Sequence, residues 1–435
     1  MIKKLKKFIK YLFFLPALCF VVTGCSNRSD ANRQSIIYWS SNNTEEILFA
    51  REIVNQWNKE NPGNIVSFQP VPEGQSSEEI ILAAVVGETT PDIYSNMWQG
   101  DVEAYAQAGV LVALDTLEGF NEFIYERCDS SVVKEITSLD GHIYQVPWKI
   151  NPIMMIYNKN LLSGIGLIEP PATYSEFFEA SKNFMKDSDG DGYIDRWFGY
   201  CEVIVTWWQR FFDFYPIYLA ASNGAPLVED NKAAFNNEYG LETFKFLKTL
   251  YDRNYFSRER ISQREDIFLS GVIASRFTGP WEIAHADKFK PEGFEYDYTT
   301  VPVPDNHTGP AYTYGDPKNI IIFKTSSNVK RVWDFVRFMS SKENDLKLLE
   351  ITNQLPRRKE LDSDPYYAEY FRRNPQMEVF GRQAKYVKGT DASPVLKEVF
   401  DLISQEYEAC VVYGKKTPEE ALNDAEKAVN LLFLK

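Results

Sequence analysis

The sequence is poor in the residues that build metal centres and disulfide frameworks. It has five cysteines and three histidines among 435 residues. Two of the cysteines lie within the first 25 residues, and the others show no CxxC spacing. The histidines have neither metal-ligand spacing nor an HExxH motif, so neither a zinc site nor a histidine-based triad is indicated. We expect small buried core residues at three positions, Cys128, Cys201 and Cys410.

Glycine, proline and long apolar runs are also scarce. With 23 Gly and 22 Pro, the composition excludes a collagen-like or disordered chain. Beyond residue 24 no apolar run approaches 18 residues, so we expect no membrane span. Acidic residues outnumber basic ones by 61 to 47, and such a surface repels the phosphates of nucleic acid. The GxSxG, Walker, GxGxxG and metalloprotease motifs are absent, which argues weakly against an enzyme.

The N-terminus has the pattern of a secretory signal. Residues 1–10 carry five lysines, and residues 11–22 are almost wholly apolar, which predicts a signal peptide over residues 1–24. The run Val22-Thr23-Gly24-Cys25 resembles a bacterial lipobox, so we expect Cys25 to carry lipid and residues 25–34 to form a tether. The alternative is an ordinary signal peptide followed by an incidental cysteine. Loss of the segment lowers the formal charge from −14 to −19.

The following residues alternate between strand and helix patterns. Strands are expected near residues 36–39, 65–71 and 91–94, and helices near 44–60 and 78–86, with Thr44 as the cap of the first helix. This alternation predicts a parallel α/β sheet, in which ligands bind beyond the carboxyl ends of the strands. Polar and aromatic residues follow two of these ends, at positions 39–43 and 95–101.

Further along, the pattern of strands and helices continues. Strands are expected at residues 143–146 and 153–157, separated by Pro147-Trp148. Capping boxes begin at Thr173 and Thr417, and amphipathic helices are expected at residues 236–255 and 329–340.

An acidic loop carries carboxylates at positions 1, 3, 5 and 9 of an EF-hand-like pattern, with Gly192 at position 6. The candidate calcium ligands are Asp187, Asp189, Asp191, Tyr193 and Asp195. Position 12, where such loops carry a bidentate Glu, is Phe198. The sequence therefore predicts a structural Ca²⁺ site, with a solvated acidic turn as the alternative.

Aromatic residues make up 15 % of the chain, and many tryptophans lie beside turns or strand ends. An indole face can cover the C–H face of a sugar ring while neighbouring polar groups bind its hydroxyls. Trp57 and Trp333 instead follow helical spacing and are expected in the core. The candidate sugar-stacking residues are Trp39, Trp98, Trp148, Trp207, Trp208 and Trp281.

Several segments together resemble one family, the extracellular solute-binding proteins of ABC importers, in the sugar-binding group typified by maltose-binding protein. They include Pro91-Asp92-Ile93, Gly279-Pro280-Trp281 and Leu355-Pro356-Arg357. The others lie at residues 104–111, 141–147, 156–161, 170–177 and 417–421. Their shared order behind a lipobox is more specific than any one of them, and the resemblance extends from about residue 36 to 432.

The resemblance implies a two-lobed α/β fold, with discontinuous lobes joined by hinge strands around a ligand cleft. We expect an N-terminal lobe from residues 35–146 plus 279–324, and a C-terminal lobe from residues 147–278 plus 325–435.

The resemblance also implies site residues. Trp281 matches the family's sugar-stacking tryptophan, and Trp98 and Asp101 follow the Pro-Asp-Ile strand in a loop one residue longer than usual. The remaining candidates are Ser41, Asn42, Asn43, Asn151, Trp207, Trp208 and Tyr314. Similarity is poor around Trp207 and Trp208. DxDGDG-like loops in other members support the calcium prediction.

The expected function is a non-enzymatic, lipid-anchored receptor outside the cytoplasmic membrane. It would capture a sugar or oligosaccharide, deliver it to ABC permease subunits and act as a monomer. One alternative is a calcium-stabilised secreted carbohydrate-active enzyme. Another is a binding protein of the same fold with a peptide, polyamine or metal ligand.

Overall fold

The computed structural model describes residues 35–72, 77–261 and 265–434. The predicted signal peptide, the predicted lipid attachment at Cys25 and the predicted tether lie outside these ranges. Within them, no helix combines the length and the apolar character that crossing a membrane requires.

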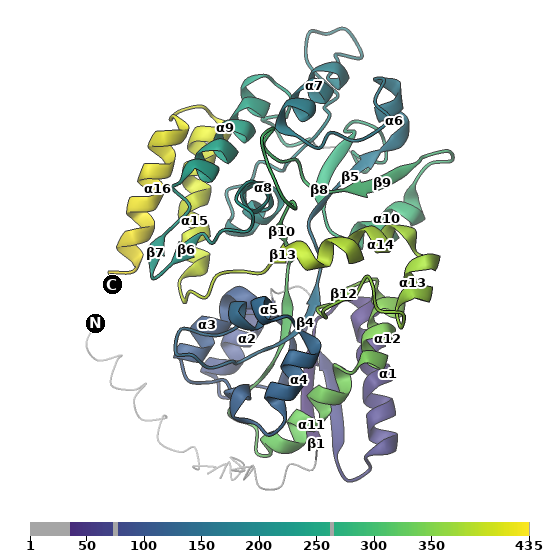
Figure 1. Cartoon of the computed structure of the whole chain (residues 1–435), viewed down its shortest axis with the longest axis vertical. Coiled ribbons are helices and arrows are strands. Elements are labelled where there is room, and N and C mark those ends of the chain that lie inside the picture. Colours follow the sequence, from purple (N-terminus) through teal and green to yellow (C-terminus); the bar gives the residue numbers. More distant parts are fainter. Residues whose placement is uncertain (1–34, 73–76, 262–264, 435) are drawn as a thin grey trace, which may run out of the picture. The chain divides into compact units, whose positions relative to one another are not determined.

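The first lobe is built on a six-stranded sheet with strand order β12-β4-β11-β3-β1-β2 (Figure 1). β1 runs parallel to β2 and β3, whereas β11 is antiparallel to β3 and β4. The strands are β1 (Ser35–Ser40), β2 (Ile65–Pro70), β3 (Ile93–Trp98), β4 (Val146–Ile150), β11 (Lys318–Ile322) and β12 (Leu355–Pro356). The helices of this lobe are α1 (Thr44–Glu60), α2 (Ser77–Val86), α3 (Gln99–Gln107), α4 (Phe120–Arg127), α5 (Ser130–Glu135), α11 (Val329–Met339) and α12 (Lys342–Thr352), with the short 3₁₀ turn η3 (Leu114–Thr116).

Helices cover both faces of this sheet, because its strands carry apolar side chains on both sides. On one face, α1, α4, α11 and α12 bury Phe49, Phe120, Trp333 and Leu348 against the strands. On the other face, α2 and α3 pack Ile81 and Val102 against β3 and β11. The sheet is therefore the middle layer of an α/β sandwich.

The second lobe contains a three-stranded antiparallel sheet of order β8-β5-β9 and a set of helices. In Figure 1 the yellow helices α15 and α16 lie beside α9. The strands are β5 (Met154–Asn158), β6 (Val228–Glu229), β7 (Lys232–Ala233), β8 (Ser275–Thr278), β9 (Tyr296–Thr299), β10 (Thr313–Tyr314) and β13 (Val387–Lys388). The helices are α6 (Lys159–Gly164), α7 (Tyr174–Phe184), η4 (Trp207–Phe212), α8 (Phe214–Ala221), α9 (Glu238–Asp252), α10 (Trp281–Phe289), α13 (Ala368–Arg373), α14 (Pro375–Gln383), η5 (Ala384–Tyr386), α15 (Leu396–Tyr407), η6 (Glu408–Val412) and α16 (Pro418–Leu432).

The predicted lobe boundaries differ from the sheet membership that the structure shows. β9 pairs with β5, so residues 279–299 belong with the second lobe and not with the first. Conversely, α11, α12 and β12 pack with the six-stranded sheet, so residues 329–356 belong with the first. The amphipathic helix predicted at residues 329–340 is confirmed as α11. Periodicity does not say which of two sheets a segment joins, and this explains the error.

The chain passes to the second lobe after β4, returns after β10 and passes again after β12. The crossing segments bind one another. The Asn151 amide donates to the Gly315 carbonyl at 2.6 Å, and the Gly315 amide donates to the Lys388 carbonyl at 2.9 Å. Paired crossing segments of this kind form the hinge of a two-lobed protein.

Local predictions are confirmed where they rest on capping and helical spacing. Both capping boxes form at Thr173 and Thr417. Trp57 and Trp333 are buried. The three cysteines at 128, 201 and 410 are free and buried, as expected.

Two local predictions are wrong. The cap of α1 is Asn43 and not Thr44, because the Asn43 side chain accepts the Glu46 amide at 3.0 Å. Pro147-Trp148 does not separate two strands but lies inside β4. Proline lacks a donor, and the register of β4 against β11 shifts at this point, so the sheet absorbs the missing hydrogen bond.

Candidate functional site

The polar residues predicted near the ligand gather at one edge of the six-stranded sheet. β1, β3 and β4 end there and β11 begins there, and from this edge the chain crosses to the second lobe (Figure 1). Ser41, Trp98 and Asn151 each follow or terminate one of these strands. This is the position that a parallel sheet gives to a binding site.

A buried ion pair between Glu46 of α1 and Lys149 of β4 organises this edge. The Ser41 hydroxyl donates to Glu46 Oε2 at 2.6 Å, and Gln354 Nε2 donates to Glu46 Oε1 at 2.8 Å. Burial would raise the pKa of Glu46, but the Lys149 ammonium and these hydrogen bonds hold it below its ordinary value. The Glu46 carboxylate is therefore charged, and both of its oxygens have hydrogen-bond partners.

Asn151 joins the same network. Its Nδ2 donates to Gln354 Oε1 at 3.3 Å, while its Oδ1 is buried without a hydrogen-bond partner among the described residues. Asn42 and Asn43 are exposed at the start of α1, where the Asn43 side chain serves as the cap. Ser41 and Asn151 are thus linked through one network that includes three residues the sequence did not single out, Glu46, Lys149 and Gln354.

A second cluster of contacts joins Trp98 and Asp101 of the first lobe to residues of the second lobe. The rings of Trp98 and Trp207 lie 5.0 Å apart between centroids, and Trp98 Nε1 donates to the Tyr314 hydroxyl at 2.9 Å. Asp101 forms an ion pair of 2.8 Å with Lys397 of α15. Burial raises the pKa of Asp101, and the Lys397 ammonium opposes this shift. Four predicted residues therefore converge, and Lys397 is a fifth that the sequence did not reveal.

Trp208 and Trp281 present aromatic surface to solvent, each with 41 % of its area exposed. Trp281 begins α10 and makes an edge contact with Phe212 of η4, at 6.2 Å between centroids. Its ring packs across Gly279, where a Cβ would lie 2.2 Å from the indole. Glycine at 279 therefore allows the indole to take this position.

Trp148 does not fit its predicted role. Its side chain is 1 % exposed and packs against Phe49 in the core of the first lobe, at 6.0 Å between centroids. The Pro-Trp pair was interpreted as a turn, whereas β4 is buried along its whole length, so the indole offers no face to a ligand. Trp39 is half-buried and packs with Tyr94 and Ile81.

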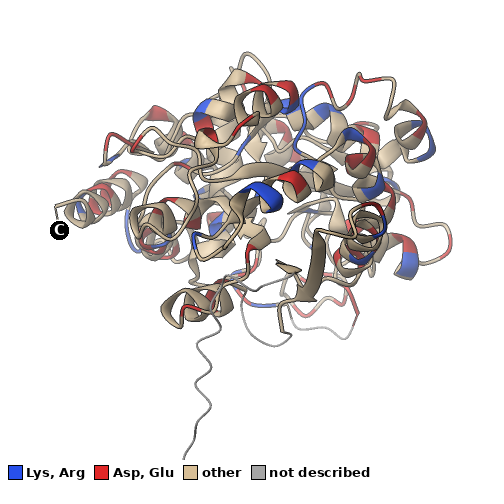
Figure 2. Cartoon of the chain, turned by 90° about the horizontal axis from the view of Figure 1, so that it is seen from below, with Lys and Arg blue, Asp and Glu red and all other residues tan. Residues whose placement is uncertain are grey.

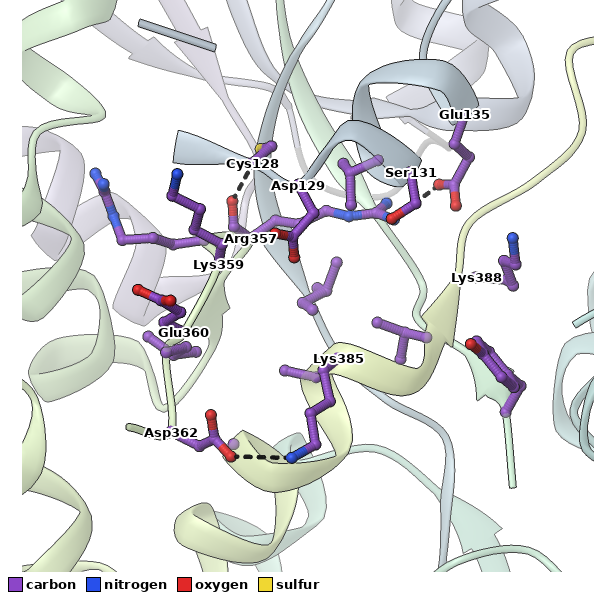
Figure 3. A pocket seen from close by; sticks show the side chains of 18 residues that line it. Cys128, Asp129, Ser131, Glu135, Arg357, Lys359, Glu360, Asp362, Lys385 and Lys388 are labelled. Atoms are coloured by element: carbon purple, nitrogen blue, oxygen red, sulfur yellow. Dashed lines mark hydrogen bonds and ion pairs between the residues drawn. The ribbon is translucent and has the colours of Figure 1, made fainter. Parts of the chain in front are cut away.

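A separate crevice of about 110 Å³ lies between α5, the segment after β12, and α14 with β13 (Figure 3). Its charged side chains largely neutralise one another, for example Arg357 with Glu135 at 2.8 Å and Lys385 with Asp362 at 3.6 Å. None of the residues predicted as ligand contacts lines it. We therefore place the candidate site at the strand ends and not in this crevice.

The acidic loop brings Asp187, Asp189 and Asp191 together, with one carboxylate oxygen of each within 4.8 Å of the others. Asp187 accepts the amides of Gly190 at 2.7 Å and Gly192 at 2.8 Å, and the Gly192 hydrogen bond lowers the pKa of Asp187. Asp195 instead accepts the Ser188 amide, and Phe198 is buried in the core. The hard oxygen donors of the first five positions fit Ca²⁺, whereas position 12 supplies none.

Calcium binding at this loop remains a prediction with a direct test. We expect CaCl₂ at about millimolar concentration to raise the thermal midpoint, because a cation relieves repulsion among the three carboxylates. Asp189→Asn should remove most of that rise. MgCl₂ serves as the control ion, because Mg²⁺ demands stricter octahedral geometry. An equal rise of the thermal midpoint in CaCl₂ for the wild type and for Asp189→Asn would contradict the prediction.

Comparison with known proteins agrees with this architecture. Residues 41–345 match the family described as bacterial extracellular solute-binding protein. The sn-glycerol-3-phosphate-binding periplasmic protein UgpB of Brucella melitensis is 24 % identical, over 87 % of this chain and 89 % of that protein. The maltotriose-binding protein of Pyrococcus abyssi is 21 % identical, over 86 % of this chain and 77 % of that protein. The crystal structure of an uncharacterized protein from Listeria monocytogenes superposes with a TM-score of 0.80 at 26 % identity, covering 92 % of this chain and all of that one.

Proposed function

Because the chain belongs to the bacterial extracellular solute-binding protein family, we propose that its solute is a sugar or short oligosaccharide held between the two lobes. The lobes close on the ligand and release it chemically unchanged to an ABC permease. Members of this family are not enzymes, so the alternative of a carbohydrate-active enzyme is not retained. The family membership also confirms the resemblance read from the sequence.

The proposal is supported by indoles that are exposed on the second lobe and by a polar acceptor without a partner at the strand ends of the first lobe. Trp208 and Trp281 offer exposed aromatic faces, and Asn151 offers a buried acceptor without a partner among the described residues. Sugar rings need this combination, because their C–H faces are apolar and their hydroxyls must be hydrogen-bonded when water is removed. The name of the Pyrococcus abyssi relative agrees with this ligand class.

The charges at the site favour a neutral sugar over a phosphate ester such as the ligand named for UgpB. Three lysines of the candidate site, two on strands of the first lobe and one on α15, already have acidic partners. Lys149 pairs with Glu46, Lys318 with Asp316 at 3.2 Å, and Lys397 with Asp101 at 2.8 Å. A phosphate needs cations that are free to bind it, and these three are engaged. In Figure 2 the basic and acidic positions alternate along the ribbon without a large region of one sign.

The remaining parts of the proposal follow from the sequence. Removal of residues 1–24 would leave Cys25 as a lipid anchor, with residues 25–34 as a tether outside the cytoplasmic membrane. The receptor would act as a monomer that docks on its permease.

Thermal denaturation with a panel of mono- and oligosaccharides tests the ligand class. A saccharide at 100 times its Kd should stabilise the native state by about 2.7 kcal/mol and raise the thermal midpoint accordingly. Trp281→Ala should weaken that response, whereas Tyr413→Ala, which removes an exposed aromatic elsewhere, should preserve it. A response to sn-glycerol 3-phosphate without a response to any saccharide would overturn the proposed ligand class.

A further inference from the structure

The Trp98 indole, a predicted sugar-stacking surface, is covered by the chain itself. Trp98 is 2 % exposed, although it terminates a strand at the binding edge of the first lobe. Trp207 lies 5.0 Å and Phe211 5.7 Å from it between ring centroids, and both belong to η4 of the second lobe. Trp98 is also part of the apolar cluster that forms the core of the second lobe. A residue of one lobe is thus packed into the other.

An ion pair between the two lobes lies beside the contact of Trp98 with Trp207. Lys397 reaches from α15 of the second lobe to Asp101 of α3 in the first, and the pair is 2.8 Å long. The Lys397 ammonium also lies 5.6 Å from the ring centroid of Trp98 and 5.4 Å from that of Trp207. The ammonium therefore binds a carboxylate and two aromatic rings at once, which is more than a surface ion pair alone provides.

Neighbouring hydrogen bonds hold the two lobes together at this point. Gln99 Nε2, next to Trp98, donates to the carbonyl of Thr390 in the second lobe at 3.0 Å. The carboxylate of Glu135 accepts the Gly389 amide at 3.1 Å and pairs with Arg357 at 2.8 Å. A Cβ at position 389 would lie 2.4 Å from the side-chain oxygens of both Gln99 and Glu135, so a larger residue there would displace these two side chains.

From this geometry we propose that Trp207 and Lys397 form an intramolecular plug on Trp98 and Asp101 in the unliganded protein. A ligand that stacks on Trp98 must displace the plug, so plug and ligand compete for one indole face. The apparent affinity is then reduced by the fraction of molecules in which Trp98 is covered. This inference rests on the proposed function, because it concerns the regulation of the same site.

The plug predicts that loss of Lys397 strengthens saccharide binding, whereas loss of a residue that contacts the ligand would weaken it. Lys397→Met keeps the side-chain stem and removes the charge, so it should loosen the plug and tighten saccharide binding about two- to fivefold. Lys248→Met is the matched control, since Lys248 pairs with Asp252 inside α9 and crosses no lobe boundary. Isothermal titration with maltotriose and with each saccharide active in the thermal panel measures the affinities.

A measurement without ligand decides the proposal if no saccharide binds. Small-angle scattering of the unliganded Lys397→Met protein should give a larger radius of gyration than wild type. The wild type should expand towards the same value in high salt, because 31 % of Lys397 and 13 % of Asp101 are exposed to screening ions. The exchange variant Asp101→Lys with Lys397→Asp should restore the compact form, and Asp101→Asn provides a second single variant.

Three outcomes separate the two proposals. Unchanged scattering in Lys397→Met and Asp101→Asn, with no salt response in wild type, overturns the plug. Equal or weaker saccharide binding by Lys397→Met also overturns it. Absence of binding to every saccharide by both proteins, together with the expected scattering change, overturns the sugar ligand and leaves the plug supported.

Discussion

Asp345→Ala is expected to destabilise the protein by about 3–5 kcal/mol, because it leaves buried guanidinium charge without its carboxylate. Asp345 of α12 is 0 % exposed, and Arg127 at the end of α4 is 1 % exposed. Arg127 donates to Asp345 at 2.7 and 3.1 Å, and Arg358 donates to the same carboxylate at 2.8 Å. Arg127 also binds the carbonyls of Pro147 and Trp148. One carboxylate therefore holds two helices, β4 and the segment after β12 together.

Urea unfolding at neutral pH measures this loss. Glu369→Ala is the matched control, because Glu369 pairs with Arg372 on an exposed helix face and its loss should leave the free energy of unfolding almost unchanged. The double variant Arg127→Met with Asp345→Leu should recover part of the stability, since it leaves fewer uncompensated buried charges. If Asp345→Ala lowers the free energy of unfolding no more than the control does, the ion pairs of Asp345 with Arg127 and Arg358 are not desolvated.

Lys149→Met is expected to cost a similar amount, about 3–5 kcal/mol near neutral pH, by leaving Glu46 charged and buried. The two side chains are 2 % and 5 % exposed. In wild type the pKa of Glu46 is lowered, so its contribution to stability is present above the unfolded pKa and is lost as the pH falls. Without Lys149, burial raises the pKa of Glu46, so stability falls as the pH rises through this region. The cost of the substitution should therefore be smaller near pH 5 than near pH 8.

Unfolding free energies at the two pH values measure the effect. Adding Glu46→Gln to Lys149→Met should remove the new pH dependence, because Gln can still accept from Ser41 and Gln354 without a charge. A penalty for Lys149→Met that does not change with pH would show that lost packing, and not the stranded carboxylate, is the cause.

The confirmed predictions concern features that are set by residues close together in the sequence. The capping boxes at Thr173 and Thr417 and the core positions Trp57 and Trp333 depend on residues within one or two helical turns. The family, its fold and the edge of the sheet that carries the polar residues were likewise readable from ordered motifs. Trp148 failed for the opposite reason, because its indole is buried against Phe49 of α1, which comes about 100 residues earlier in the chain.

By itself, the amino-acid order determined much of the succession of strands and helices and the membership of a solute-binding family. Folding in three dimensions decided which lobe takes residues 279–299 and 329–356, and that Lys149 meets Glu46. It also decided that Trp98 lies against Trp207 instead of facing solvent. Helix and strand patterns are set by neighbours a few residues apart, whereas sheet membership, ion pairs and the covering of an indole depend on contacts between residues more than a hundred positions apart.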